Sequence, residues 1–170
     1  ACCYKALHFN PNFAEAYNNL GSALNELGKL DKAINSFHNA LTINSEYAKA
    51  HSNLGSIHQE LGQLDKAVTH YQKALAIKPN FAEAHSNLGH ALKELGKLDE
   101  AVMSCQKALI VKPNFAEAHN NLGNTFQKLL KLDEAVHSYH QALAIKPDYV
   151  EARFNLGNAL KELLKLDDAV

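Results

Sequence analysis

Histidines and cysteines are the residues of this chain best suited to bind metals or to act as nucleophiles. The sequence has ten histidines, and His51, His85 and His119 recur at a fixed interval. Equivalent atoms of successive repeated units lie on the order of 10 Å apart, too far to share one metal ion. His137 and His140 lie three residues apart and could share a helix face, but their motif supplies no carboxylate or cysteine beside them. We therefore predict no metal and no cofactor. The histidines are expected to pack against neighbouring side chains or to be exposed to solvent.

Catalytic motifs are absent from the sequence. It contains no glycine-rich phosphate loop, no Gly-x-Ser-x-Gly elbow, no His-Glu-x-x-His pair and no Cys-x-x-Cys site. Cys2 and Cys3 are adjacent and Cys105 lies far from both, so the cysteines do not form a disulfide framework. We predict that the chain is not an enzyme and that it resides in the cytoplasm or another reducing intracellular compartment.

Neutral polar side chains form the strongest recurring pattern. An asparagine recurs every 34 residues and is followed three residues later by serine, histidine or asparagine. A neutral amide offers both a donor and an acceptor, which suits it to the backbone of an extended peptide whatever the peptide's side chains. The predicted peptide-binding residues are Asn19, Asn53, Asn87, Asn121 and Asn155, with Ser22, Ser56, His90, Asn124 and Asn158 as their neighbours.

The charges that flank this polar stripe are mostly acidic. Four residues before each asparagine and seven residues after it, eight glutamates stand against Lys49 and Lys128. Basic or neutral peptides are therefore expected to bind in preference to phosphates. The formal net charge of -1 and the lack of a basic stripe argue against a nucleic-acid partner, RNA included. The predicted partner is a protein or peptide.

A structural role is the alternative for the same asparagines. Next to the core, their amides could tie neighbouring units together by hydrogen bonds, and polar stripes are also ordinary solvated helix faces. Recent duplication of one unit would repeat the residue without any role in binding. The sequence leaves these alternatives open.

A repeated tripeptide, Asn-Leu-Gly, defines the elements that carry these residues and follows the same 34-residue period. Such a period predicts stacked copies of one supersecondary unit instead of a single globular core. With Ala14 as the first residue of a unit, the chain forms one array. It comprises complete units at 14–47, 48–81, 82–115 and 116–149, the end of an earlier unit at 1–13 and the start of a later one at 150–170.

Each unit is predicted to be a helix, a short turn and a second helix. In the unit 82–115, apolar residues recur at intervals of three and four on both sides of Gly96, which is the pattern of amphipathic helices. Gly96 suits the left-handed end of the first helix, and Asp99 suits the start of the second. The polar stripe lies on the first helix, on the side away from the leucines.

Helix starts and turns carry further local predictions. Asparagine or aspartate three residues before glutamate has capping-box spacing, as in Asn12 and Glu15, Asn80 and Glu83, Asn114 and Glu117, and Asp148 and Glu151. Leu130 and Leu164 replace the turn glycines of other units, so those turns are expected to be strained or reshaped, with an exposed leucine. Cys3 and Cys105 stand where other units have an aromatic residue, which predicts buried, unreactive thiols.

The spacing of large, small and aromatic residues resembles that of the tetratricopeptide repeat. The residues that carry the resemblance are Tyr17, Leu20, Gly21, Ala33, Phe37 and Ala40 in the first complete unit, with Pro79 and Pro113 at later junctions. The small residues stand where helices approach closely, and leucines and aromatics fill the remaining space. The resemblance implies an all-α, right-handed superhelical solenoid of helix-turn-helix units, in which first helices line a concave groove and second helices form the convex back.

The recurring asparagine is similar to that of the repeats that precede the catalytic domain of O-linked N-acetylglucosamine transferases. In those repeats an asparagine ladder holds the peptide backbone of the substrate, which implies the same contacts for the asparagines named above. The carboxylate-clamp subfamily, which holds the C-terminal tails of heat-shock chaperones, needs basic residues at set positions of the first helices. Here Lys49 is the one basic residue at those positions, so binding of chaperone tails is not expected.

Three functions remain open at the level of sequence. The first is a protein–protein interaction scaffold that binds an extended peptide in the groove. The second is a self-assembly element that stacks head to tail. Because the chain begins and ends within second helices, we expect a fragment of a longer array, with apolar residues Leu160, Leu163 and Leu166 at an end face. The third is the substrate-recruiting region of a larger glycosyltransferase. No apolar run of about 18 residues is present, so no membrane segment is predicted.

Overall fold

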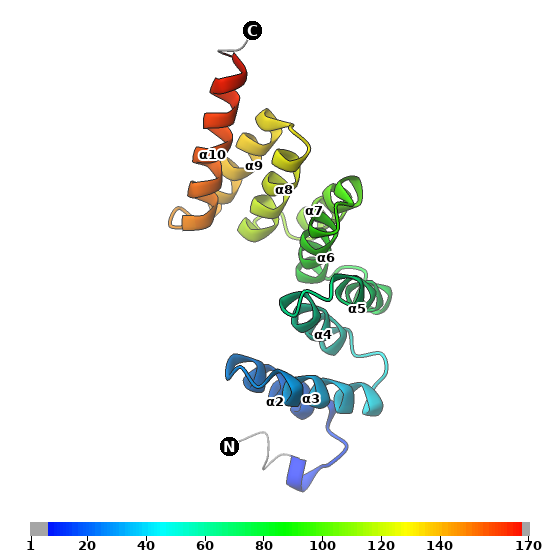
Figure 1. Cartoon of the computed structure of the whole chain (residues 1–170). Helices are drawn as coiled ribbons and strands as arrows, with labels where there is room; N and C mark the ends of the chain where they lie inside the picture. The colour runs from blue at the N-terminus through cyan, green and yellow to red at the C-terminus, as the bar shows by residue number, and fades with distance from the viewer. Residues whose placement is uncertain (1–6, 168–170) are drawn as a thin grey trace. The chain divides into compact units, whose positions relative to one another are not determined.

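The computed structural model describes residues 7–167, and their side chains through residue 164. Regular structure in this range is helical, which confirms the predicted all-α class. The prediction for the Cys3 thiol lies outside the described residues, as does that for the Leu166 side chain. The helices, labelled in Figure 1, are α2 (Ala14–Glu26), α3 (Leu30–Ile43), α4 (Ala48–Glu60), α5 (Leu64–Ile77), α6 (Ala82–Glu94), α7 (Leu98–Val111), α8 (Ala116–Lys128), α9 (Leu132–Ile145) and α10 (Val150–Asp167).

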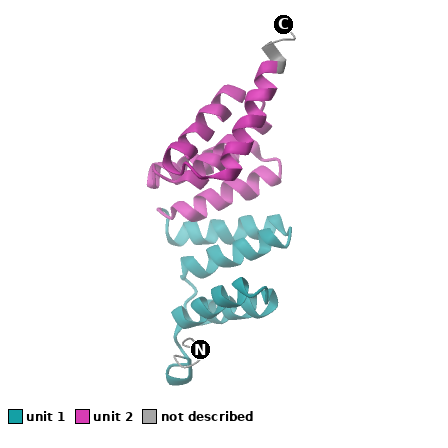
Figure 2. Cartoon of the chain, turned by 90° about the vertical axis from the view of Figure 1, so that its left-hand side faces the viewer, with its two compact units in different colours: residues 1–79 teal, residues 80–170 magenta. Residues whose placement is uncertain are grey.

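The chain divides into two compact units, residues 1–79 and residues 80–170 (Figure 2). In the first unit, α2 packs on α3, α3 on α4 and α4 on α5, and α2 also contacts α4. In the second unit, each helix from α6 to α10 packs on the next, α6 also contacts α8, and α8 also contacts α10. Within each unit, therefore, the first helices of successive repeats lie against one another in a layer.

The two helices of a repeat approach most closely at the glycine of Asn-Leu-Gly. A Cβ atom added to Gly55 would lie 2.6 Å from Cε1 of Tyr71, which is closer than unbonded carbon atoms come. At Gly89 the added atom would lie 2.5 Å from Sγ of Cys105 and 3.1 Å from the backbone oxygen of Ala101. The prediction that small residues mark close approaches of helices is therefore confirmed at these positions.

Apolar side chains between the paired helices form a core that also joins one repeat to the next. In the first unit, Phe37 is 1% exposed and packs in a cluster with Leu20, Leu24, Leu54 and Ile57. These residues come from α2, α3 and α4, so the cluster spans two repeats. Full burial of one such side chain stabilises the fold by about 2 kcal/mol. Tertiary packing of this kind, more than helix propensity, stabilises short helices.

Residues in the left-handed backbone conformation end the first helices, as the turn glycines predict. Gly96 has φ +76°, its N–H donates to the Lys93 carbonyl at 3.1 Å, and the N–H of Lys97 donates to the Leu92 carbonyl at 2.9 Å. Leu130 adopts the same conformation with φ 59° and is 78% exposed. This turn therefore keeps its shape and places a leucine in a backbone region that favours glycine, which confirms the prediction of a strained turn.

The predicted helix caps are wrong. The residue immediately before α6 is Phe81, and it makes no side-chain capping hydrogen bond; Phe13 and Phe115 stand in the same place before α2 and α8. The asparagines of the predicted capping boxes, Asn12, Asn80 and Asn114, precede these phenylalanines, and Asp148 lies two residues before α10. An Asx side chain caps a helix from the residue directly before its first turn, so a displacement of one residue removes the cap. Asp99 does not cap α7 either, because that helix begins at Leu98 after Lys97.

The predicted turn at Leu164 is also absent. Helix α10 continues through this position to Asp167, and the Leu164 side chain is 64% exposed. Leucine permits both outcomes, because Leu130 at the equivalent position turns with φ 59° whereas the helix continues at Leu164. The prediction of an exposed leucine holds here, whereas the prediction of a turn does not.

Exchange of a tightly packed glycine for alanine tests the helix contact. Gly123→Ala places a Cβ atom 2.6 Å from the Tyr139 ring and should lower the free energy of unfolding by about 1–3 kcal/mol. Gly157→Ala is the matched control in α10, where an added Cβ meets no described atom within 4 Å. It should raise the free energy of unfolding by about 0.5–1 kcal/mol through helix propensity. Urea unfolding followed by circular dichroism measures both, and equal effects would contradict a steric role for the glycine.

Leu130→Gly tests the strain in the left-handed turn between α8 and α9. Glycine adopts positive φ without steric cost and little burial is lost, so the variant should gain about 1 kcal/mol of stability. The reverse exchange, Gly62→Leu, should lose a similar amount because Gly62 has φ +70°. Thermal melting checks both variants. Unchanged melting temperatures for the pair would show that the leucine is accommodated without strain.

Candidate functional site

A hollow of about 560 Å³ in the second unit brings together side chains from α6, α8 and α10. Asn124 from α8 and Asn155 from α10 both line it, and both belong to the predicted peptide-binding set. The structure therefore gathers two of the predicted residues from successive first helices at one surface depression. Its lining residues are Lys93, Asn124, Gln127, Lys128, Leu130, Glu151, Asn155 and Glu162.

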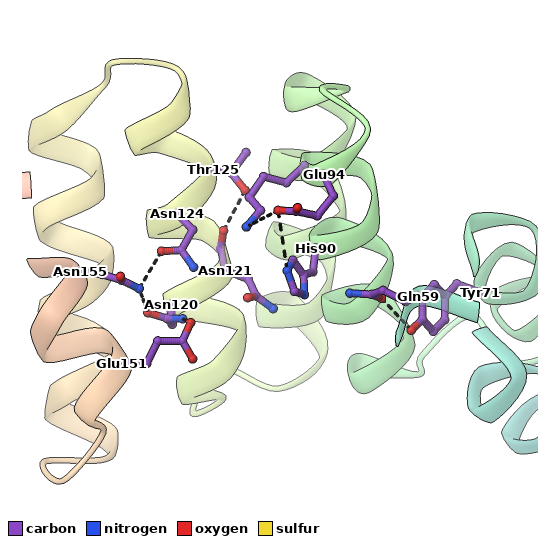
Figure 3. A network of polar contacts seen from close by, with 11 residues as sticks. Gln59, Tyr71, His90, Glu94, Asn120, Asn121, Asn124, Thr125, Glu151 and Asn155 are labelled. Carbon is purple, nitrogen blue, oxygen red and sulfur yellow. Dashed lines mark hydrogen bonds and ion pairs between the residues drawn. The ribbon is translucent and has the colours of Figure 1, made fainter. Parts of the chain in front are cut away.

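Asn155 links its own helix to the first helix of the preceding repeat. Its Nδ2 donates to Oδ1 of Asn120 at 3.2 Å and to Oδ1 of Asn124 at 2.9 Å (Figure 3). Nδ2 of Asn120, a side chain only 1% exposed, in turn donates to Oε1 of Glu151 at 2.9 Å. Three hydrogen bonds between amide and carboxylate side chains therefore join α8 and α10.

The same bridge recurs elsewhere along the first helices. In the first unit, Nδ2 of Asn53 donates to Oδ1 of Asn18 at 2.9 Å. In the second unit, Nδ2 of Asn121 donates to Oγ of Ser86 at 3.0 Å. Each of these recurring asparagines therefore ties its helix to the preceding first helix, through the residue just before the asparagine of that helix. At Asn53 and Asn121 the tie uses one N–H of Nδ2 and leaves Oδ1 and the second N–H for other partners, whereas Nδ2 of Asn155 donates to two acceptors.

The residues three places after the asparagines are fixed from the second helices. The Tyr71 hydroxyl donates to Oε1 of Gln59 at 2.9 Å and lies within hydrogen-bond distance, 3.2 Å, of Oγ of Ser56. Asn124 receives a hydroxyl hydrogen bond of 2.8 Å from Tyr139 in the same way. Burial raises the pKa of Tyr71 to about 12, so this phenol stays protonated and able to donate. The sequence analysis missed these bonds, although tyrosine and glutamine occur together at these two positions.

His90 lies beside a charged pair instead of a tyrosine. Its Nε2 is 4.0 Å from Oε1 of Glu94, and Nζ of Lys93 is 2.9 Å from the same oxygen. Burial and then the positive charge of Lys93 lower the pKa of His90, so the imidazole is neutral near pH 7. The hydrogen bond from Lys93 lowers the pKa of Glu94. His90 is therefore a neutral polar group beside a carboxylate that stays ionised.

The other predicted residues differ in exposure. Ser22 is half-buried and its Oγ donates to the Asn18 carbonyl at 3.2 Å, so it binds its own helix. Asn87 is half-buried too, whereas Asn19 and Asn158 are exposed. The structure thus places the predicted set on first helices, with hydrogen bonds between neighbouring helices at Asn53, Asn121 and Asn155.

The histidines and Cys105 are the residues best suited to bind a metal or to act as a nucleophile. In residues 7–167, no group of three or more histidine, cysteine, aspartate or glutamate side chains is arranged to hold a metal ion, and His137 and His140 are exposed on α9. Cys105 is fully buried, and burial raises the pKa of its thiol to about 12, which confirms the predicted unreactive cysteine. No helix within that range has both the length and the apolar character needed to cross a bilayer.

One buried amide of the first unit has a donor without an acceptor. Asn18 is fully buried, and no described residue lies in hydrogen-bond range of its Nδ2. Asn120 occupies the equivalent position in the second unit and donates to Glu151. Lys49 stands at the position that corresponds to Glu151, and an ammonium group cannot accept a hydrogen bond. The exchange of glutamate for lysine therefore accounts for the missing acceptor.

Lys49→Glu should restore that acceptor and raise the free energy of unfolding by about 1 kcal/mol, since an unsatisfied buried donor costs about 1–3 kcal/mol. Urea unfolding measures the gain. A glutamate in the first turn also interacts favourably with the helix dipole, so the exchange is repeated in an Asn18→Ser background. There the part of the gain that comes from the hydrogen bond should vanish. An equal gain in both backgrounds would contradict the proposed pairing with Asn18.

Comparison with protein families connects this architecture to a known repeat. A family model described as TPR repeat matches residues 21–62, 57–96 and 89–129. Two models described as tetratricopeptide repeat match residues 116–149 and 2–35. All of these descriptions concern a repeat, and none of them names a catalytic activity. Comparison with curated proteins gives no significant match.

Solved structures with a similar fold include proteins of different kinds. In the crystal structure of the APC/C hetero-tetramer Cut9-Hcn1, the TM-score is 0.86 and the identity 23%, over 93% of this chain and 32% of that one. This chain thus spans about a third of the chain it matches there, and that likeness concerns the fold alone. For MamA the TM-score is 0.74 and the identity 27%, over 85% of each chain. For the first TPR of Spaghetti, solved with the HSP90 peptide SRMEEVD, the TM-score is 0.67 and the identity 25%, over 71% of this chain and 96% of that one.

The matched segments extend over most of the sequence, from residue 2 to residue 149. They coincide with paired helices whose close contact depends on the glycine of each repeat. The chain therefore belongs to the tetratricopeptide repeat family.

Proposed function

We propose that this repeat array is a protein-interaction scaffold that binds an extended peptide segment along its first helices. The observation that carries the proposal is the hollow lined by Asn124 and Asn155, two amides from successive first helices of the second unit. A hollow of about 560 Å³ has room for a short stretch of peptide. The first TPR of Spaghetti, which has a similar fold, is solved with a bound peptide.

The anchored amides suit recognition of a peptide backbone. Asn53 and Asn121 each use Nδ2 within the protein, so their side chains are held in one orientation before any ligand arrives. The remaining Oδ1 of each can accept from a peptide N–H, and the second N–H can donate to a peptide carbonyl. A group already fixed in place loses little conformational entropy on binding, which favours affinity. The tie between helices and the contact to peptide are therefore compatible roles of one residue.

Charge in the hollow is balanced, which favours contacts to the peptide backbone over contacts to charged side chains. Lys93 and Lys128 line it together with Glu151 and Glu162. Glu151 accepts a hydrogen bond from Asn120, and Glu162 accepts one of 3.1 Å from Gln127. Because the first helices outside the hollow carry more glutamates than lysines, we expect neutral or basic peptides. Recruitment of substrate for a larger glycosyltransferase, suggested by the similar asparagine spacing, is one form that this function could take.

Self-association is a second candidate, and it rests on α10. Val150, Phe154, Leu160 and Leu164 are 78%, 68%, 40% and 64% exposed, and their spacing places them on one face of the helix together with Gly157. An apolar helix face of this size is a common site of contact between proteins. Head-to-tail stacking would cover it, and a mass that rises with concentration in analytical ultracentrifugation would support this candidate.

Selection from a phage-displayed library of random linear peptides tests the groove. We expect a peptide to bind the full chain, and its affinity should survive most alanine exchanges in the peptide. N-methylation of its backbone amides should instead weaken binding, because each methyl group removes a hydrogen-bond donor. Asn121 lies on α8 three residues before Asn124 of the hollow, and the proposed peptide extends to its anchored amide. Asn121→Ala should therefore lower the affinity about fivefold, in line with the loss of roughly 1 kcal/mol of hydrogen bonding.

Asn39→Ala, an exposed asparagine on α3, is the matched control and should leave affinity unchanged. Urea unfolding of each variant separates binding from stability. If Asn121→Ala lowers the unfolding midpoint and leaves peptide affinity at the wild-type value, the asparagines serve only to tie helices together. A selected peptide whose affinity is unchanged by every exchange on the first helices would also overturn the proposal.

A further inference from the structure

Two histidines face one another inside the second repeat of the first unit. Nδ1 of His51 on α4 lies 3.2 Å from Nδ1 of His70 on α5. The ring centroids are 5.4 Å apart, so these nitrogens lie between the rings and point toward each other. The sequence analysis did not pair these residues, because it compared histidines at equivalent positions of different repeats.

The His51 ring also interacts with the backbone of its own chain segment. A hydrogen bond with the backbone of Ser45, six residues earlier, acts on the ring. The corresponding bond is visible at His119, whose Nε2 lies 3.1 Å from the carbonyl oxygen of Pro113, also six residues earlier. If His51 donates from Nε2 as His119 does, the lone pair of the neutral ring lies on Nδ1, directed at His70. A backbone carbonyl behind a histidine is also the usual partner of a metal-binding imidazole.

We propose that His51 and His70 form a binding site for a divalent transition metal, with Nδ1 of each imidazole as a ligand. Metal–nitrogen bonds of about 2.05 Å to two nitrogens 3.2 Å apart subtend an angle of about 103° at the ion, between the tetrahedral and square arrangements. The rings point head-on, so each must rotate for the lone pairs to converge, and both side chains are half-buried. Imidazole ligands suit Zn²⁺, Ni²⁺ and Cu²⁺, with Cu²⁺ the tightest binder.

The surroundings define what else the ion would meet. His58 stacks on His70 with centroids 5.3 Å apart, and its Nδ1 lies 2.9 Å from Oε1 of Gln63. Within residues 7–167, no third carboxylate, thiol or imidazole completes a group of three with the pair. Water or a group from a partner would therefore fill the remaining coordination positions.

Protonation does not oppose binding at neutral pH. Burial, followed by the charges of His51 and His58, lowers the pKa of His70 to about 4. Burial and the charge of Lys73 lower the pKa of His51 as well. Both rings are therefore neutral near pH 7. One Nδ1 carries the proton of the 3.2 Å hydrogen bond between them, and metal binding requires that proton to move to Nε2 of the same ring. Lys73 also acts on the pair as a positive group, so it weakens binding without removing it.

The pair is a departure from the repeat. Where His70 stands, the other complete repeats have Ser36, Ser104 and Ser138. Each of these serines donates its Oγ to the carbonyl four residues earlier, at 2.8, 2.9 and 2.7 Å. The fold therefore accepts serine at this position, and histidine adds a side chain that repeat packing does not require. This site is independent of the peptide groove proposed above.

Calorimetric titration of the full chain with Ni²⁺, and electron paramagnetic resonance with Cu²⁺, test the site. Cys2 and Cys3 are replaced by serine in every sample, so that thiolates do not compete for the ion. We expect one ion bound per chain and a Cu²⁺ spectrum that shows coordinated nitrogen. His70→Ser, which restores the residue of the other repeats, should weaken binding roughly tenfold or more, and so should His51→Gln. His119→Gln is the matched control and should change nothing.

A gain of function provides a second arm. Ser138→His places an imidazole opposite His119, in the arrangement of the natural pair, and should raise the stoichiometry to two ions per chain. Wild-type affinity in His70→Ser, or no binding by the wild type at millimolar metal, would overturn the proposal. Should His70→Ser fail to fold in a urea titration, His51→Gln and the Ser138→His stoichiometry decide the question, and one ion bound by Ser138→His would count against it.

Discussion

The contact between a glycine of the first helix and a large side chain of the second is the constraint on which the other features depend. Because Gly55 has no Cβ, the Tyr71 ring lies directly against the backbone of α4. That position carries the tyrosine hydroxyl past the core to Ser56 and Gln59. The polar side chains of the first helix are therefore oriented by the packing of the apolar core beneath them. Any larger residue at Gly55 would shift both the core and the polar surface.

Local features of the fold could be predicted from the sequence, because each depends on a few neighbouring residues. The helical period, the left-handed turn at Gly96 and the strained turn at Leu130 are of this kind. The caps failed for a local reason: a displacement of one residue puts Phe81, not Asn80, before α6. The helix continues at Leu164 although Leu130 turns, so residue type alone does not decide that position. Single positions therefore predicted the helical period and the turns at Gly96 and Leu130, but neither the helix caps nor the continuation of α10.

Polar bonds between helices could not be predicted, because they depend on the reach of side chains from different repeats. Whether Asn155 meets Asn120, Asn124 or solvent is a matter of fractions of an ångström in the spacing of α8 and α10. The sequence posed structural and binding roles as alternatives for the asparagines. The structure shows a tie through Nδ2 at Asn53 and Asn121, and this tie occupies one part of each amide only. The remaining donor and acceptor are what the proposed groove requires.

Departures from the repeat carry more information when they are examined as contacting pairs. Tyr71 occurs with Gln59, which accepts its hydroxyl hydrogen bond. In the preceding repeat, Phe37 has no hydroxyl, and the buried Oδ1 of Asn25 at the corresponding place has no described partner. A hydroxyl on the second helix thus meets an acceptor on the first helix in one repeat, and in the other repeat both the hydroxyl and the hydrogen bond are missing. His70 is a departure on one helix only, because its partner His51 recurs as His85 and His119 in repeats that keep a serine at the His70 position. Two imidazoles in contact have a chemistry that neither has alone, which is why comparison of single positions along the period did not reveal it.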